Sequence, residues 1–240
     1  MFKKNIYKTN SDLPFKINRT KIDLFFDCKR CFYLDQKYGI RRPHGAPLVL
    51  NNRIVDDFKK ELNECRITQK IHPEIMKLEK QFIPLFHSKL DDWRSSFKGA
   101  RFLHNKTNLV LSGIIDDIWT NQLTHLNHAV IIKSTSKSEK INIDNIWHGY
   151  WRQLSLYSFL LHKNTLPMSK TGIFLYINAK SNSENKIVFN LNYFEKILDF
   201  NWIEPTICEI YKTLNDNKIP EKKYNCKFCN YYSNIKRIDE

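Results

Sequence analysis

The sequence predicts an α/β fold with a mixed central sheet flanked by helices, and three observations support this prediction. Of the 240 residues, 42% are hydrophobic and 13% are aromatic, which supplies a core and excludes a chain that is disordered throughout. Helix-like and strand-like patterns follow one another in the order helices, three strands, helix, two strands, helix. Two Cys-x-x-Cys pairs, at 28–31 and 226–229, predict that a metal site clasps the two ends of the chain.

The first part of the chain predicts two helices. Apolar residues at helical spacing follow the capping-type segment 18–20, which predicts a helix that carries the first Cys-x-x-Cys pair at its end. A second helix is expected from about 48 to 65, because Ile54, Phe58 and Leu62 repeat at the spacing of one helical face.

The remainder predicts a sheet interrupted by a long helix. Short helix-like and loop segments over 72–94 precede the first strand. Runs of β-branched and aromatic residues predict five strands, at 100–104, 108–120, 125–135, 171–180 and 186–192. Helical periodicity predicts the long helix over about 144–162, between the third and fourth strands, and a last helix over 204–214.

The charge of the chain favours polyanionic partners. Lys and Arg number 39 and Asp and Glu number 25, which leaves a net charge of +14. Binding to phosphates releases counterions, so a basic chain of this kind is expected to bind nucleic acid. The alternative is an AT-biased genome that places Lys wherever a surface tolerates it, and composition alone does not decide between the two.

The four paired cysteines, Cys28, Cys31, Cys226 and Cys229, predict one metal centre. A Cys-x-x-Cys turn places two sulfurs on one metal, and two such turns complete the four thiolates of a zinc or iron–sulfur site. Two disulfides or a redox motif are the alternatives, but thiols stay reduced without a secretory signal, and a redox motif does not explain a second pair.

The sequence predicts a protein that is neither inserted in a membrane nor secreted. No apolar run approaches the roughly 18–20 residues of a membrane helix, so no membrane partner is expected. The N-terminal segment is basic but lacks an apolar stretch, which argues against a secretory signal and favours a cytoplasmic location.

The two remaining cysteines, Cys65 and Cys208, lie in helical patterns and are predicted to be small buried hydrophobic residues.

Three motifs follow one another in the middle of the chain. The first, Gly113-Ile-Ile-Asp116-Asp117-Ile-Trp119, is a strand with an acid among branched apolar residues. The second, Ala129-Val-Ile-Ile-Lys133-Ser-Thr135, is an apolar strand with a lysine near its end. The third, Gln153-Leu-Ser-Leu-Tyr157, places Gln153 and Tyr157 one helical turn apart on the same face. Each motif is weak alone, but their order and spacing together are specific.

Together with the terminal cysteines, these motifs resemble the PD-(D/E)XK nuclease superfamily, and especially its RecB-like branch that includes the CRISPR adaptation nucleases. The resemblance runs from segment 23–34 to segment 225–229. It implies a single domain over 1–240 with a restriction-endonuclease-like core at about 48–200. It also implies that segments of about 20–40 and 220–232 hold a [4Fe–4S] cluster, with zinc as the alternative.

The resemblance further implies a metal-dependent DNA nuclease acting on single- or double-stranded DNA. Asp116 would bind Mg²⁺ or Mn²⁺, Lys133 would be the catalytic lysine, and Gln153 and Tyr157 would face the site. Phosphodiester hydrolysis needs an activated water and neutralisation of the charge that grows on the phosphate, which carboxylate-bound metal and a lysine supply. Strand alternation explains the D-x-K spacing, because residues i and i+2 face the same way.

The sequence departs from this family pattern at two metal-binding positions. Ile131 stands where the acid of D-x-K belongs, so the second carboxylate is missing. The early helix lacks the histidine that family members often carry; Asp56 or Asp57 is a candidate oxygen ligand there, although a solvated helix face is the competing interpretation. The expected activity is therefore impaired, and the alternative is a catalytically inactive protein that binds nucleic acid or a partner protein.

Overall fold

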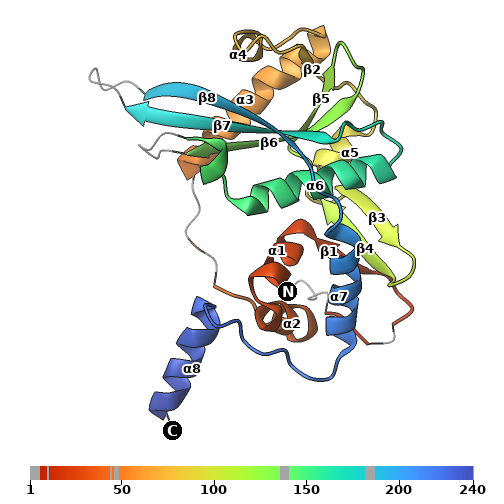
Figure 1. Cartoon of the computed structure of the whole chain (residues 1–240), viewed down its shortest axis with the longest axis vertical. Coiled ribbons are helices and arrows are strands. Elements are labelled where there is room, and N and C mark those ends of the chain that lie inside the picture. The colour runs from red at the N-terminus through yellow and green to blue at the C-terminus, as the bar shows by residue number, and fades with distance from the viewer. Residues whose placement is uncertain are drawn as a thin grey trace. The chain divides into compact units, whose positions relative to one another are not determined.

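The computed structural model describes residues 6–9, 11–43, 45, 49–135, 141–181 and 187–239. They form two compact units (Figure 1). Unit 1 takes its residues from 1–46, 102–112 and 201–240, and unit 2 from 47–101 and 113–200. The predicted α/β class is confirmed, with two sheets in place of one. No helix in these described ranges is both long enough and apolar enough to cross a membrane.

Unit 1 contains a small sheet, three-stranded and with the order β1-β4-β3, together with four helices. Its elements are β1 (Phe15–Asn18), α1 (Arg19–Asp27), α2 (Lys29–Tyr38), β3 (Ala100–His104, whose first two residues belong to unit 2), β4 (Leu109–Gly113, whose last residue belongs to unit 2), α7 (Ile203–Asn215) and α8 (Lys227–Asp239). Strand β1 runs parallel to β4, with Phe15 opposite Leu109. The prediction missed β1 and α8.

The predicted first helix is two helices, because the chain breaks at Cys28. The Asn18 side chain accepts a hydrogen bond from the backbone N–H of Lys21 and so starts α1 where the capping signal predicts. Cys28 then adopts an extended backbone, with φ −164° and ψ 111°, and serves as the residue that precedes α2. The first Cys-x-x-Cys pair therefore lies at the N-terminus of a helix, where the helix dipole favours thiolates.

Unit 2 is built on a five-stranded sheet with the order β2-β5-β6-β7-β8. Its elements are α3 (Val49–Thr68), α4 (Pro73–Met76), β2 (Phe82–Pro84), α5 (Leu90–Arg94), β5 (Asp117–Asn121), β6 (Asn127–Thr135), the 3₁₀ helix η1 (Ile143–Asn145), α6 (His148–Lys163), β7 (Thr171–Ser181) and β8 (Ile187–Ile197). Strands β6 and β7 are parallel, and the other neighbours are antiparallel. The predicted starts at Leu48 and Lys186 lie outside the described residues.

The two long helices of unit 2 cover opposite faces of this sheet (Figure 1). On one face, Leu62 of α3 packs in a core with Val130 and Ile132 of β6, and the predicted apolar face of α3 points at it. On the other face, Trp151 of α6 packs on Phe174 of β7. Alternation along β6 therefore assigns each of its residues to the α3 face or to the α6 face.

The predicted strand 108–120 is two strands that belong to different sheets. Strand β4 ends at Gly113 and β5 begins at Asp117, and the backbone N–H of Ile115 donates instead to the carbonyl of Trp93, at 3.0 Å. The apolar composition of 108–120 continues through this break, which explains why the sequence pattern did not reveal it. As a result, Asp116 lies just outside the ladder of β5.

Candidate functional site

The four predicted cysteines come together in unit 1. The Cys31 sulfur lies 3.4 Å from that of Cys229 and 3.6 Å from that of Cys226, and the sulfurs of Cys28 and Cys229 are 3.9 Å apart. All four sulfurs lie within 4.8 Å of one another, and all four side chains are buried. These separations exceed the about 2.05 Å of a disulfide bond, so the four cysteines are free thiols.

The surroundings of this cysteine group favour thiolates on one side of it. Burial would raise the pKa of Cys28, but hydrogen bonds from the backbone N–H groups of Lys223 and Cys31 outweigh it and lower that pKa to about 7. The Arg42 guanidinium donates to the Cys226 sulfur at 3.5 Å. Burial raises the pKa of Cys31 and Cys229, so a metal bound here would have to supply the free energy that removes their protons.

The donor set fits a bound metal. Four sulfurs from two Cys-x-x-Cys turns, buried and in mutual contact, match the ligand type and number of structural zinc sites and of iron–sulfur clusters. The other two cysteines lie outside the group: Cys65 is half-buried and Cys208 is exposed. The prediction that Cys208 is buried is wrong, because the buried face of α7 is formed instead by Ile203, Thr206, Ile207, Ile210 and Leu214.

The candidate nuclease site lies in unit 2, where Asp116 pairs with two lysines. The Lys133 ammonium lies 3.3 Å from one Asp116 carboxylate oxygen, which joins the first two sequence motifs. The Lys59 ammonium donates to the other oxygen at 3.0 Å, from the middle of α3. Sequence reasoning missed Lys59, because a lysine on a helix that carries charged residues of both signs gives no signal of its own.

These lysines keep Asp116 ionised. Burial would raise the pKa of the Asp116 carboxyl, but the charges of Lys133 and Lys59 and their hydrogen bonds outweigh burial and lower it. The carboxylate is thus held as an anion between two cations. The cluster of three side chains carries a net charge of +1.

Ile131 occupies the position that the missing acid would take. The register pairs Asp117 with Val130, so Ile131 is the next residue of β6, level with Asp116 and on the same strand face as Lys133. Its side chain is fully buried, and its neighbour on β7 is Phe174. An apolar side chain in this apolar layer offers no ligand to a cation.

Asp117 points away from Asp116, as alternation predicts. It is completely buried and forms an ion pair with Arg66 of α3. It also accepts hydrogen bonds from the backbone N–H of Ile118 at 2.8 Å and from the indole N–H of Trp119 at 3.3 Å. These contacts give Asp117 a structural role and leave it no part in the Asp116 cluster.

Neither candidate acid of the early helix contacts Asp116 in the described part of the chain. Asp57 accepts from Arg53 and from Lys60, each at 2.8 Å, on the exposed side of α3. Asp56 is exposed. Of this stretch of α3, Lys59 is the residue that the described structure brings to Asp116.

Gln153 and Tyr157 form a pair of their own on α6. The Gln153 amide donates to the Tyr157 hydroxyl at 2.8 Å, which is the i to i+4 contact that their spacing predicts. Both side chains are buried, and the Gln153 carbonyl oxygen has no hydrogen-bond partner within the described part of the chain. Their roles in catalysis stay predictions.

Tyr157 also explains the glycine of the first motif. A Cβ atom on Gly113 would lie 2.7 Å from the Tyr157 ring, closer than real side-chain contacts allow. We expect Gly113→Ala to displace this ring and to destabilise the protein by about 1–3 kcal/mol, the usual cost of overpacking. Denaturant unfolding followed by fluorescence measures the change. Gly45→Ala is the control, because no atom lies within 4 Å of its added Cβ and no change is expected.

The structure therefore brings together the four cysteines in one unit and the Asp116–Lys133 pair in the other. It adds Lys59 to that pair and keeps Asp57 away on other partners. No protein-family model matches the chain, and no curated protein matches it either.

Proposed function

We propose that this protein is a nucleic-acid-binding protein of the PD-(D/E)XK nuclease type in which DNA cleavage is impaired. The order of the motifs around Asp116, Lys133 and Gln153 supports this, as does the pairing of Asp116 with Lys133. Unit 2 would be the restriction-endonuclease-like core. The assignment of residues 1–240 to one nuclease-like domain stays a prediction.

One observation carries the impairment: both hydrogen-bond partners of Asp116 in the described structure are lysines. Mg²⁺ and Mn²⁺ need oxygen ligands, and carboxylates supply most of the attraction. Here the Lys59 ammonium takes one oxygen of Asp116, and Ile131 replaces the second acid. Two cations around one anion repel a divalent cation and weaken its binding.

The same cluster attracts the phosphates of nucleic acid. Its net positive charge is partly shielded from water, because the side chains of Asp116, Lys59 and Lys133 are 15%, 22% and 29% exposed. A phosphate oxygen placed between the ammonium groups would accept charge-assisted hydrogen bonds. The excess of 14 positive charges over the whole chain supports DNA as the partner.

The spacing of the cysteine sulfurs favours a single metal ion. Four sulfurs at about 2.3 Å from one tetrahedral zinc lie about 3.8 Å from one another. Three of the six sulfur pairs here are 3.4 to 3.9 Å apart, close to this value, and all six are within 4.8 Å. In a [4Fe–4S] cluster each sulfur binds a different iron, which spreads the four sulfurs farther apart. We therefore favour zinc, and metal analysis of protein purified without oxygen distinguishes zinc from a brown cluster protein.

The decisive experiment compares Mn²⁺ binding and DNA cleavage by the natural protein and two variants. We expect the natural protein to bind Mn²⁺ weakly and to leave single- and double-stranded DNA intact. Lys59→Ala removes one ammonium and should raise Mn²⁺ affinity about tenfold, because one nearby like charge is lost. Adding Ile131→Asp supplies the second carboxylate and should raise it further, if thermal unfolding shows that the variant folds.

Lys60→Ala is the matched control for Lys59→Ala. It removes the same charge from the next residue of α3, where Lys60 is exposed and pairs with Asp57. Its Mn²⁺ affinity should equal that of the natural protein. Strong Mn²⁺-dependent cleavage by the natural protein, abolished by Asp116→Ala, would show that the nuclease is active and that the proposal of impaired cleavage is wrong.

A further inference from the structure

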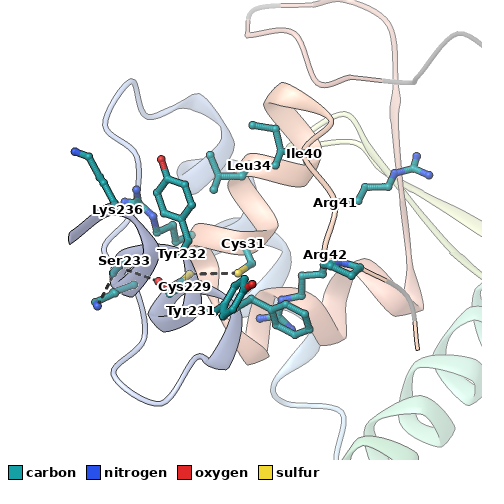
Figure 2. Close-up of a pocket in the computed structure, with 14 residues that line it drawn as sticks. Cys31, Leu34, Ile40, Arg41, Arg42, Cys229, Tyr231, Tyr232, Ser233 and Lys236 are labelled. Atoms are coloured by element: carbon teal, nitrogen blue, oxygen red, sulfur yellow. Dashed lines mark hydrogen bonds between the residues drawn. The ribbon is translucent and has the colours of Figure 1, made fainter. Parts of the chain in front are cut away.

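A pocket of about 790 Å³ lies in unit 1, beside the cysteine group (Figure 2). Its wall is formed by the first two turns of α2, the segment 40–43, Lys222 and one side of α8. Cys31 of α2 and Cys229 of α8 both line it. The volume is within the roughly 300–1,000 Å³ of pockets that hold small ligands.

The lining of this pocket is basic. Five cationic side chains contribute to it and no acidic one does; they are Arg30, Arg41, Arg42, Lys222 and Lys236. The positive charges of two of them are partly compensated by acids outside the pocket, since Arg42 pairs with Asp27 at 2.9 Å and Arg41 lies 3.6 Å from Asp35. Lys222 makes a neutral contact, with the Ser233 hydroxyl at 3.3 Å. The pocket therefore offers positive charge to an anion.

Aromatic rings stand among these cations. Tyr231 and Tyr232 are 69% and 64% exposed, although both lie on the wall of a pocket. Phe228 carries the Arg42 guanidinium over its ring, at 4.8 Å from the ring centre. Exposed rings beside cations are the combination that binds single-stranded nucleic acid, because bases stack on the rings while phosphates pair with the cations.

We propose that this pocket binds a single strand of nucleic acid, with bases stacked on Tyr231 and Tyr232 and phosphates paired with Lys222 and Arg30. A duplex fits less well, because its base faces are covered by stacking within the duplex. The inference rests on the proposed nucleic-acid-binding function and assigns it a second contact, in the unit that holds the cysteines. The metal, by joining α2 and α8 through Cys31 and Cys229, would hold the pocket in shape.

The test uses fluorescence anisotropy with a labelled oligothymidylate and with a duplex of the same length. The natural protein should bind the single strand more tightly. Tyr231→Ala and Tyr232→Ala should each weaken binding about fivefold or more, the usual effect of losing one stacked base. Lys222→Ala should lower the slope of log affinity against log salt by about 0.7, the value for one phosphate contact to a single strand.

Two control variants lie in the same unit but outside the pocket. Tyr224 is 84% exposed and does not line it, so Tyr224→Ala should bind like the natural protein. Lys218 is also exposed, and Lys218→Ala should leave the salt slope unchanged. Unchanged metal content and melting temperature show that the tyrosine variants are folded.

The outcomes separate this inference from the proposed function. Binding that is equally tight in Tyr231→Ala, Tyr232→Ala and the natural protein overturns the proposal that this pocket binds a single strand, and it leaves the proposed function unaffected. Tighter binding of the duplex overturns it as well. A natural protein that binds neither oligonucleotide overturns both.

Discussion

We expect Cys31→Ser to abolish metal binding and to unfold unit 1 at the temperature where the natural protein is folded. The Cys31 sulfur makes the two shortest contacts of the cysteine group, at 3.4 and 3.6 Å. A structural zinc ion contributes about 10–16 kcal/mol of apparent binding free energy. The free energy of unfolding of a folded protein is only about 5–15 kcal/mol. Losing the metal therefore removes a free energy comparable to the entire net stability.

Thermal unfolding and metal analysis measure this effect together. Cys208→Ser is the matched control, because Cys208 is an exposed cysteine outside the group, and this variant should keep its metal and its melting temperature. Treatment of the natural protein with a strong chelator should reproduce the unfolding of Cys31→Ser. A Cys31→Ser protein that melts like the natural one would show that the cysteines do not stabilise unit 1 through a metal.

The second large effect concerns the buried ion pair between Arg66 and Asp117. Asp117 is completely inaccessible to water and its other partners are neutral N–H groups, so within the described part of the chain Arg66 supplies its compensating charge. We expect Arg66→Leu to destabilise the protein by about 3–5 kcal/mol, the cost of leaving a buried charge without its partner. Urea unfolding measures the change.

A second variant separates the lost charge from lost packing. Arg66→Leu combined with Asp117→Asn removes both charges, so it should be more stable than Arg66→Leu alone. Arg53→Leu breaks an exposed pair with Asp57 on the same helix and should change stability little. If the double variant were less stable than Arg66→Leu, the cost would come from packing instead of from the unpaired charge.

Local patterns predicted the long elements of unit 2 well. The helix expected at 144–162 is α6, because helical periodicity extends over many residues, and the strand expected at 125–135 is β6, because it contains a run of β-branched apolar residues. The apolar face of α3 is also confirmed, since Leu62 lies in the core with Ile54 and Phe58 packed against it. Four-residue β1 gave no comparable signal, because too few residues repeat to define a period.

Contacts between distant residues explain what the sequence did not predict. The cysteines were identifiable because their spacing is distinctive and few residue types bind metal through sulfur. Lys59 and Arg66 were not, because their importance comes from Asp116 and Asp117, which lie 57 and 51 residues away. The break at Cys28 was hidden as well, since the apolar spacing continues from α1 into α2.

The segmented course of the chain has a consequence for the order in which the protein is made. Unit 2 is complete once residue 200 has left the ribosome, whereas unit 1 still lacks 201–240 at that moment. Cys28 cannot contact Cys229 until Cys229, 201 residues later in the chain, has been synthesised. At about 5–20 residues per second, this delay lasts about 10–40 seconds. During synthesis the first two thiols therefore stand without their partners, open to oxidation or to a mismatched metal, until α8 emerges.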